Sequence, residues 1–428
     1  MQLELASFKI NRVELGREMT FHGQTLTVNP DAIRETFFHD SAFEDVTIDV
    51  AHPGESLRIV HVLDAIEPRI KTSGPGVAFP GFLGSAKTVG EGSTARLEGL
   101  SIVQTAEFPE PTSGVLSVRE SFIDMSGPAA AYCACSNTAN LVLSFRPKTG
   151  ITNEKFDTAI RYGSLKLAEQ LAKLTQGQAP QEIEQLTLDN DSRNKGRPRV
   201  AYILVIRQQG LLIQNFLYGV PTAGLVPTFI HPNELIDGAL VSGDFKGGLR
   251  VCTALHCNDP VVKSLYASHG QEVDFVGVIL ATAYHATHQL KERSAQYAAK
   301  LARLLRVDGV IVPLIGAGNA SIDTMLVTKA CEEVGIKAVT ICHEIGGAEG
   351  TDSPLSEHFP EADAIVSMGN IAREISVPPS DRVLGGETLW FHRSDKIIDS
   401  STGFIATGHD LFCGAWQMGI SGFSAKDF

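Results

Sequence analysis

The stretch from Cys252 to Pro260 holds the densest group of chemically reactive side chains in the sequence. Its nine residues include two thiols, an imidazole, an amide and a carboxylate, from Cys252, Cys257, His256, Asn258 and Asp259. Asp259 followed by Pro260 predicts a helix start, because aspartate caps helices and proline fits their first position. A thiol near a helix N-terminus has a lowered pKa and is a better nucleophile. We take Cys252, His256 and Asn258 as candidate catalytic residues; the alternative is a capped loop with two incidental cysteines.

Two further candidates lie where predicted strands end. Glu344 follows an apolar run and precedes Gly346-Gly347, which makes it a candidate general base or amine ligand, with a solvated turn as the alternative. The turn Gly316-Ala317-Gly318-Asn319 joins a strand to a helix, and its glycines let a helix N-terminus approach an anion. Ser321 stands where a dinucleotide-binding fingerprint has its third glycine, so a plain strand-to-helix turn is the favoured interpretation.

The spacing of the cysteines does not indicate a metal site. Cys133 and Cys135 are separated by one residue, unlike the cysteines of common zinc knuckles. We therefore expect no metal. Seven cysteines in 428 residues are typical of a cytoplasmic protein with mostly reduced thiols.

These candidates lie in a region where buried strands alternate with helices. The predicted strands are Val200–Ile206, Val226–Ile230, Phe275–Ala281, Gly309–Ile315, Ala338–Cys342 and Ala364–Met368. Helices are expected between most of them, for example at Leu290–Leu305 and Ile322–Val334. This alternation predicts a doubly wound, mostly parallel α/β (Rossmann-like) domain over residues 198–428, with ligands at the carboxyl ends of its strands.

The first part of the chain has a different pattern. Residues 2–14 alternate apolar and polar side chains, which is typical of strands, and the glycine-rich stretch 73–92 predicts loops. We expect a β-rich N-terminal domain over residues 1–175, ending in a helix. The polar segment 176–197 is predicted to be a linker between the two domains.

Composition excludes several classes of function. The chain has 36 Lys and Arg against 49 Asp and Glu, a formal net charge of −13. An acidic surface repels phosphate backbones and anionic lipid, so neither nucleic acid nor a membrane is an expected partner. The N-terminus has no basic region followed by an apolar stretch, and no apolar run approaches the roughly 20 residues of a membrane helix.

Several segments, taken together and in order, resemble one family: the proprotein subunit of component B of the glycine, sarcosine and betaine reductases. The matching stretches are Pro53–Ile59, Ile66–Arg69, Phe79–Gly81, Ile123–Gly127, Pro227–Glu234, Asp237–Ala239, Phe275–Ile279, Lys291–Ser294, Asp308–Ile311, Gly318–Asn319, Ser376–Pro379 and Val383–Gly385. We take His231 and Glu234, in one of these stretches, and Gly318 and Asn319, in another, as candidate substrate-binding residues.

The resemblance implies a specific chemistry. Family precursors cut themselves at an internal cysteine and leave a pyruvoyl group, whose carbonyl captures the substrate amine. A partner subunit carrying selenocysteine then displaces the amine. For this chain it implies a small amine substrate, a thiol- or selenol-bearing partner and an oligomeric complex that cleaves a C–N bond reductively.

The sequence departs from the family at the residue that would become the pyruvoyl group. The family cysteine is expected after a Ser-Gly-Asn type of segment, and here Ser242-Gly243-Asp244 is followed by Phe245. The nearest downstream thiol is Cys252, whose use would give fragments of 251 and 177 residues. Two hypotheses follow: a reductase subunit with a pyruvoyl group derived from Cys252, or an uncleaved homologue. The uncleaved chain would either perform thiol-dependent chemistry through Cys252 or Cys257 with His256, or act as a non-catalytic scaffold for a partner reductase.

Overall fold

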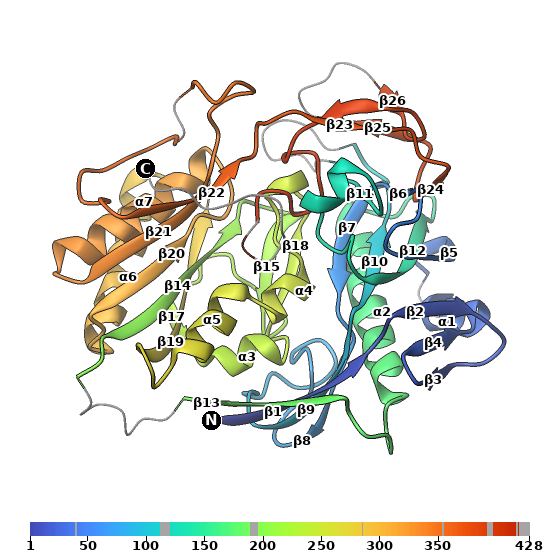
Figure 1. Cartoon of the computed structure of the whole chain (residues 1–428), viewed down its shortest axis with the longest axis horizontal. Coiled ribbons are helices and arrows are strands. Elements are labelled where there is room, and N and C mark those ends of the chain that lie inside the picture. Colours follow the sequence, from blue (N-terminus) through green and yellow to red (C-terminus); the bar gives the residue numbers. More distant parts are fainter. Residues whose placement is uncertain are drawn as a thin grey trace.

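The computed structural model describes residues 1–38, 41–111, 120–188, 196–284, 286–352, 355–391, 397–416 and 418, and it is a mixed α/β structure (Figure 1). Its largest sheet has six strands in the order β17-β19-β14-β20-β21-β22. Their bounds are β14 Arg199–Gln208, β17 Thr228–Ile230, β19 Asp274–Tyr284, β20 Gly309–Pro313, β21 Lys337–Glu344 and β22 Ile365–Asn370. All neighbours pair in parallel except β17 and β19, so the six predicted strands and the mostly parallel sheet are confirmed.

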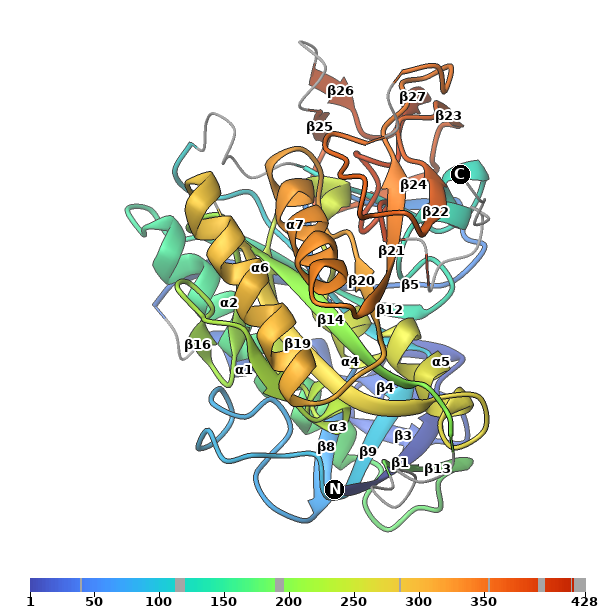
Figure 2. The same ribbon diagram turned by 90° about the vertical axis from the view of Figure 1, so that its left-hand side faces the viewer.

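Helices cover both faces of this sheet, and strand β14 is therefore buried on both sides. Its odd-numbered side chains pack against α6 (His288–Leu304) and α7 (Asn319–Glu333), which stand in front of the sheet in Figure 2. Its even-numbered side chains pack against α3 (Pro232–Ile236) and α5 (Pro260–Ser268). The start of α5 is as predicted: the Asp259 side chain accepts hydrogen bonds from Val261 N and Val262 N at 2.9 and 3.1 Å.

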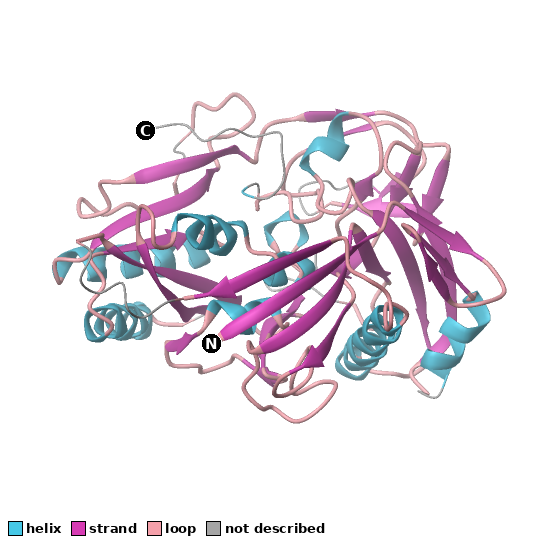
Figure 3. Ribbon diagram, turned by 60° about the horizontal axis from the view of Figure 1, so that its bottom comes forward, coloured by secondary structure: helices cyan, strands magenta, loops and turns pink. Residues whose placement is uncertain are grey.

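Strands β1 to β12 lie before residue 150, which agrees with the expected β-rich first part. Figure 3 shows several long strands around the N-terminus. One sheet has the order β13-β1-β9-β8 and another β5-β12-β10-β7. The bounds are β1 Gln2–Lys9, β5 Phe43–Ala51, β7 Val62–Ile66, β8 Arg69–Ser73, β9 Gly92–Glu98, β10 Leu100–Thr105 and β12 Ala139–Pro147. The helices are α1 Pro30–Phe38 and α2 Asn153–Lys173, and α2 buries Phe156, Ile160 and Leu167 in the core of this part.

Smaller elements complete the fold. They are β2 Arg12–Leu15, β3 Thr20–His22, β4 Thr25–Val28, β6 Leu57–Ile59, β11 Ile123–Asp124, η1 Pro128–Tyr132, β15 Ile213–Leu217, β16 Val220–Pro221, β18 Leu240–Asp244, η3 Gly247–Leu249, α4 Thr253–Cys257, β23 Ile375–Val377, β24 Arg382–Leu384, β25 Thr388–Trp390, β26 Ile397–Asp399 and β27 Phe404–Ala406. In the described part of the chain, every helix is too short or too polar to cross a membrane.

The segment expected as a linker contains strand β13, Glu182–Thr187, which pairs antiparallel with β1. Of its side chains only Leu186 is buried, because β13 is the outer strand of its sheet. Because this strand is polar and exposed, its sequence has the composition of a linker, and a linker is what it predicts. Residues 189–195 of the same segment lie outside the described residues.

The end of the chain returns to the first part of the fold. Strand β24 pairs in parallel with β6, and Phe122 forms a bridge with Leu411. Side chains between Ile375 and Cys413 share one apolar cluster with β6 and β7. The described residues between 375 and 413 therefore pack on the strand-rich part of the fold.

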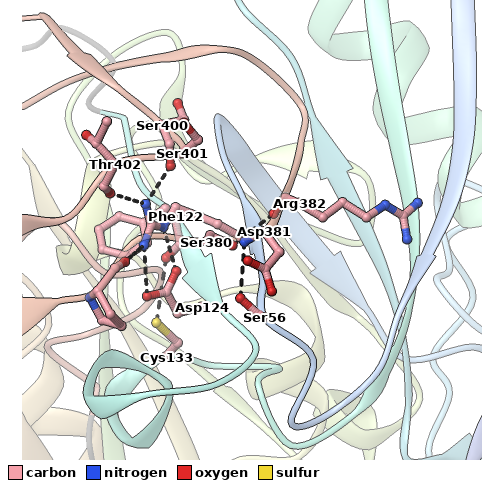
Figure 4. A network of polar contacts seen from close by, with 12 residues as sticks. Ser56, Phe122, Asp124, Cys133, Ser380, Asp381, Arg382, Ser400, Ser401 and Thr402 are labelled. Carbon is pink, nitrogen blue, oxygen red and sulfur yellow. Dashed lines mark hydrogen bonds and ion pairs between the residues drawn. The ribbon is translucent and has the colours of Figure 1, made fainter.

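Arg58 of β6 binds this returning segment, and Figure 4 shows its partners Asp124, Ser400 and Thr402 close together. Its guanidinium is buried and pairs with Asp124, with 2.6 Å between Nε and Oδ1. The same group donates to the carbonyl oxygens of Pro378, Ser400 and Thr402. One side chain thus satisfies three backbone acceptors of the C-terminal segment.

Candidate functional site

The carboxyl edge of the six-stranded sheet is the expected ligand position, because β14 lies where the strand order reverses. Arg207 near the end of β14 forms a buried ion pair with Asp244 of β18, at 2.7 Å from Nε to Oδ2. A Cβ added to Gly316 would lie 3.4 Å from Arg207 Nη1, so the guanidinium borders the turn after β20. Sequence reasoning missed Arg207, because only the fold brings it to this edge.

Three of the predicted residues, Gly318, Asn319 and Glu344, lie at the carboxyl edge of the six-stranded sheet. Gly318 is the N-cap of α7, with φ +62°, and Asn319 is the first residue of that helix. Glu344 ends β21, is half-buried and accepts a hydrogen bond of 2.5 Å from Ser367 Oγ. These residues therefore end or follow strands at the same edge of the sheet as Arg207.

His343, next to Glu344, is a buried residue that sequence reasoning passed over. Burial, with His409 and Arg207 nearby, lowers the pKa of His343 to about 3. Neither of its ring nitrogens has a hydrogen-bond partner among the described residues. Burial therefore keeps the imidazole neutral near pH 7.

His231 and Glu234 lie at the opposite edge. Strand β17 runs antiparallel to β19, so its end at Ile230 pairs with Val278, in the amino-terminal half of β19. The two residues form a capping box at the start of α3: the His231 ring accepts from Asn233 N, and Glu234 accepts from His231 N at 2.7 Å. Their geometry is that of a helix cap, distant from the other candidates.

Cys252 is fully buried at the N-cap position of α4. Its thiol lies within hydrogen-bonding range of the Cys135 and Cys413 thiols, which come from other parts of the chain. Burial raises the pKa of Cys252 well above its usual value. The expectation of a lowered pKa is therefore wrong, because removal of the thiolate from water outweighs the field of a five-residue helix.

His256 and Asn258 do not form a catalytic pair with Cys252. Burial lowers the pKa of His256 to about 3, and neither ring nitrogen has a hydrogen-bond partner in the described structure. The Asn258 side chain donates to Glu67 and accepts from Arg96 Nη1 at 2.9 Å. The amide of Asn258 is thus committed to residues of the first part of the chain.

The segment from Asp244 to Thr253 joins the two parts of the molecule. Arg250 donates to the carbonyl oxygens of Val62 and Leu63 at 2.6 and 2.7 Å, and Asp64 accepts from Thr253. Leu249 contacts the loops at the carboxyl edge through Ala317 and Ile345. The segment from Asp244 to Thr253, which we call the candidate segment, therefore lies between the carboxyl edge of the sheet and strand β7.

The residues of this segment do not fit a pyruvoyl precursor. Phe245, at the expected position, cannot form the group; its ring is buried, with its centroid 5.5 Å from that of Phe108. Cys252 has no exposed surface through which a substrate amine would reach it. Within the described ranges, no three His, Cys, Asp or Glu side chains are grouped to hold a metal ion.

The sequence matches define a family of subunits of reductase complexes. The chain belongs to the family of glycine/sarcosine/betaine reductase component B subunits, whose family model matches residues 1–421. It is 34% identical over 392 residues to the glycine reductase complex component B subunits alpha and beta of Peptoclostridium acidaminophilum, covering 90% of this chain and 89% of the relative. It is 35% identical over 392 residues, with the same coverage, to the sarcosine reductase complex component B subunit alpha of that organism.

A third relative is the betaine reductase complex component B subunit alpha of the same organism, 32% identical over 457 residues, with both chains covered completely. The resemblance noted in the sequence is therefore confirmed. None of the solved structures matches the chain.

Proposed function

We propose that the chain is the substrate-binding subunit of a complex that reductively cleaves the C–N bond of a small amine. A partner subunit would supply the attacking thiol or selenol, since this sequence contains no selenocysteine. The observation that carries the proposal is the family match over residues 1–421. The relatives named for glycine, sarcosine and betaine reductase complexes indicate the substrate class.

The carboxyl edge supplies groups suited to such a substrate. Glycine, sarcosine and betaine share a carboxylate, and the N-terminus of the 15-residue helix α7, at Gly318 and Asn319, favours an anion. The Arg207 guanidinium, which is paired with Asp244, borders that turn. Glu344 is the candidate base or ammonium ligand, oriented by Ser367.

We further propose that the chain works uncleaved, without a pyruvoyl group. Phe245 at the expected position and the complete burial of Cys252 both support this choice. The thiol-dependent alternative has less support, because burial raises the pKa of Cys257 to about 11 and leaves His256 neutral. The seven cysteines are free thiols, which suits a cytoplasmic complex.

Intact mass of the purified chain tests the absence of cleavage. We expect one species at 46.0 kDa that does not react with carbonyl reagents. Fragments of 251 and 177 residues, the shorter one reactive with hydroxylamine, would instead establish Cys252 as a pyruvoyl precursor.

Assay of the complex reconstituted with its thiol- or selenol-bearing partner tests the reaction. We expect amine release from at least one of glycine, sarcosine and betaine. Cys252→Ala should retain activity, like the control Cys331→Ala, which changes a buried cysteine of α7. Stable assembly without turnover of any of the three amines would favour a scaffold.

A further inference from the structure

A cavity of about 210 Å³ lies in the strand-rich part of the molecule. The candidate segment, from Asp244 to Thr253, separates it from the carboxyl edge of the six-stranded sheet. It is bounded by Val62 and Leu63, whose carbonyl oxygens hold Arg250, and by Phe108, whose ring lies against Phe245. This volume is below the roughly 300–1,000 Å³ of pockets for drug-sized ligands, so it suits a ligand of a few heavy atoms.

The charges around this cavity are unbalanced. Its described walls include Glu107, Glu110 and Glu120, and His61 is the one basic residue that the structure describes among them. Glu110 is engaged elsewhere, since it accepts a hydrogen bond of 3.2 Å from Asn153 N at the start of α2. Among the described lining residues, two carboxylates therefore remain around one imidazole.

His61 is fixed between these two carboxylates. Its Nε2 lies 2.9 Å from Glu107 Oε1, and its Nδ1 lies 3.7 Å from Glu120 Oε2. The residue is buried, its φ is +53°, and its ring lies so close to Gly386 that a Cβ there would be 2.5 Å away. Its Nε2, although near Glu107, has no aligned hydrogen bond in the described structure. A strained, buried imidazole facing a cavity is typical of a binding site.

The remaining walls suit an organic cation. Phe108 and Trp390, two aromatic residues, line the cavity, and aromatic rings attract ammonium groups. Burial raises the pKa of Glu120, so its ionised form is under-solvated and gains from a neighbouring positive charge. Trp390 N donates a hydrogen bond of 2.5 Å to Glu120 Oε2, which keeps the carboxylate in place.

We propose that this cavity binds a small organic ammonium cation between Glu107, Glu120 and the rings of Phe108 and Trp390. The inference goes beyond the proposed function: the cavity has no lining residue in common with the carboxyl edge proposed for the substrate, so its ligand is a second small ammonium ion. The lining residues Phe108, Val62 and Leu63 contact Phe245 and Arg250, so an amine bound here lies next to the segment from Asp244 to Thr253.

Isothermal titration calorimetry on the full isolated chain tests the site. The probes are tetramethylammonium, methylammonium and the neutral isostere tert-butanol, at constant ionic strength. We expect saturable binding of at least one ammonium ion and none of tert-butanol. Glu120→Gln should raise Kd at least about tenfold, because it removes a charge from a poorly solvated position, and Glu107→Gln, at a 68% exposed side chain, should raise Kd about threefold.

Glu35→Gln is the matched control, since Glu35 is an exposed glutamate of α1 remote from the cavity lining, and it should leave Kd unchanged. Glu107 has a 68% exposed side chain, so Glu107→Gln will fold even if Glu120→Gln does not. The proposal is overturned if neither ammonium ion binds, if tert-butanol binds equally well, or if Glu107→Gln binds like the wild type. Because no partner is present, binding without turnover in the complex would refute the proposed function and leave the site intact.

Discussion

The Asp64 carboxylate accepts two hydrogen bonds from Thr253, one from its backbone N–H at 2.9 Å and one from its hydroxyl at 2.6 Å. This contact ties strand β7 of the strand-rich part to the first residue of α4, directly after Cys252. Burial nevertheless raises the pKa of Asp64 to about 6, against the opposing effect of these hydrogen bonds.

Asp64 should make the protein less stable as the pH rises from 4 to 6. In that range the folded state keeps a proton that the unfolded state has lost, so the stability present below pH 4 disappears by about pH 6. The expected loss of unfolding free energy is about 3 kcal/mol, and Asp64→Asn should abolish this loss. Urea unfolding of both proteins at pH 4 and pH 7 measures the difference. An equal pH dependence in the two proteins would contradict the assignment.

Arg58→Met should cost about 3–5 kcal/mol of unfolding free energy, because Asp124 is left buried without its partner. The returning segment 375–413 also loses the donor for three of its carbonyl groups. Arg382→Ala is the control: its ion pair with Asp49 is 48% exposed on the arginine side and is worth less than about 1 kcal/mol. Chemical denaturation at pH 7 compares the variants, and equal losses would show that the buried network has no special role.

Lys291 of α6 and Asp323 of α7 form a buried ion pair, and Lys291 also donates to Asn319 O at 3.3 Å. Lys291→Met should destabilise the protein by about 3–5 kcal/mol, since the buried Asp323 carboxyl then loses its partner. The double variant Lys291→Met, Asp323→Leu should recover most of this loss. Thermal and urea unfolding measure the coupling free energy between Lys291 and Asp323. Additive losses of stability in the double variant would rule out a direct interaction.

His256→Leu should stabilise the protein in acid and leave it nearly unchanged at pH 7. The unfolded chain binds a proton on this histidine below about pH 6.5, whereas burial keeps the folded imidazole neutral down to about pH 3. The unfolding free energy of the wild type is therefore about 2 kcal/mol lower at pH 5 than at pH 7, and that of the variant does not show this loss.

The control for His256 is His22→Leu, at an exposed position of β3, which should not change the acid dependence. Unfolding at pH 5 and pH 7 measures both variants. Loss of activity in the assembled complex, with stability retained, would instead return His256 to the catalytic residues.

The sequence alone predicted the elements of the α/β sheet, because a strand buried on both faces, such as β14, reads as a continuous apolar run. Asp259 and Pro260 likewise identified the start of α5 through local rules of helix capping. The family was also visible in the sequence, since its short matching stretches run in order through both halves of the chain.

Only the tertiary structure decided which candidates meet. Nothing local marks the pairing of β24 with β6 or of β13 with β1, because these short or polar strands are joined by contacts between distant parts of the chain. Burial reversed the expected pKa shift of Cys252, and the antiparallel β17 carried His231 to the opposite edge from Glu344. Side-chain type and spacing indicate what a residue is able to do; solvent access and neighbours, which the fold alone fixes, determine whether it does so.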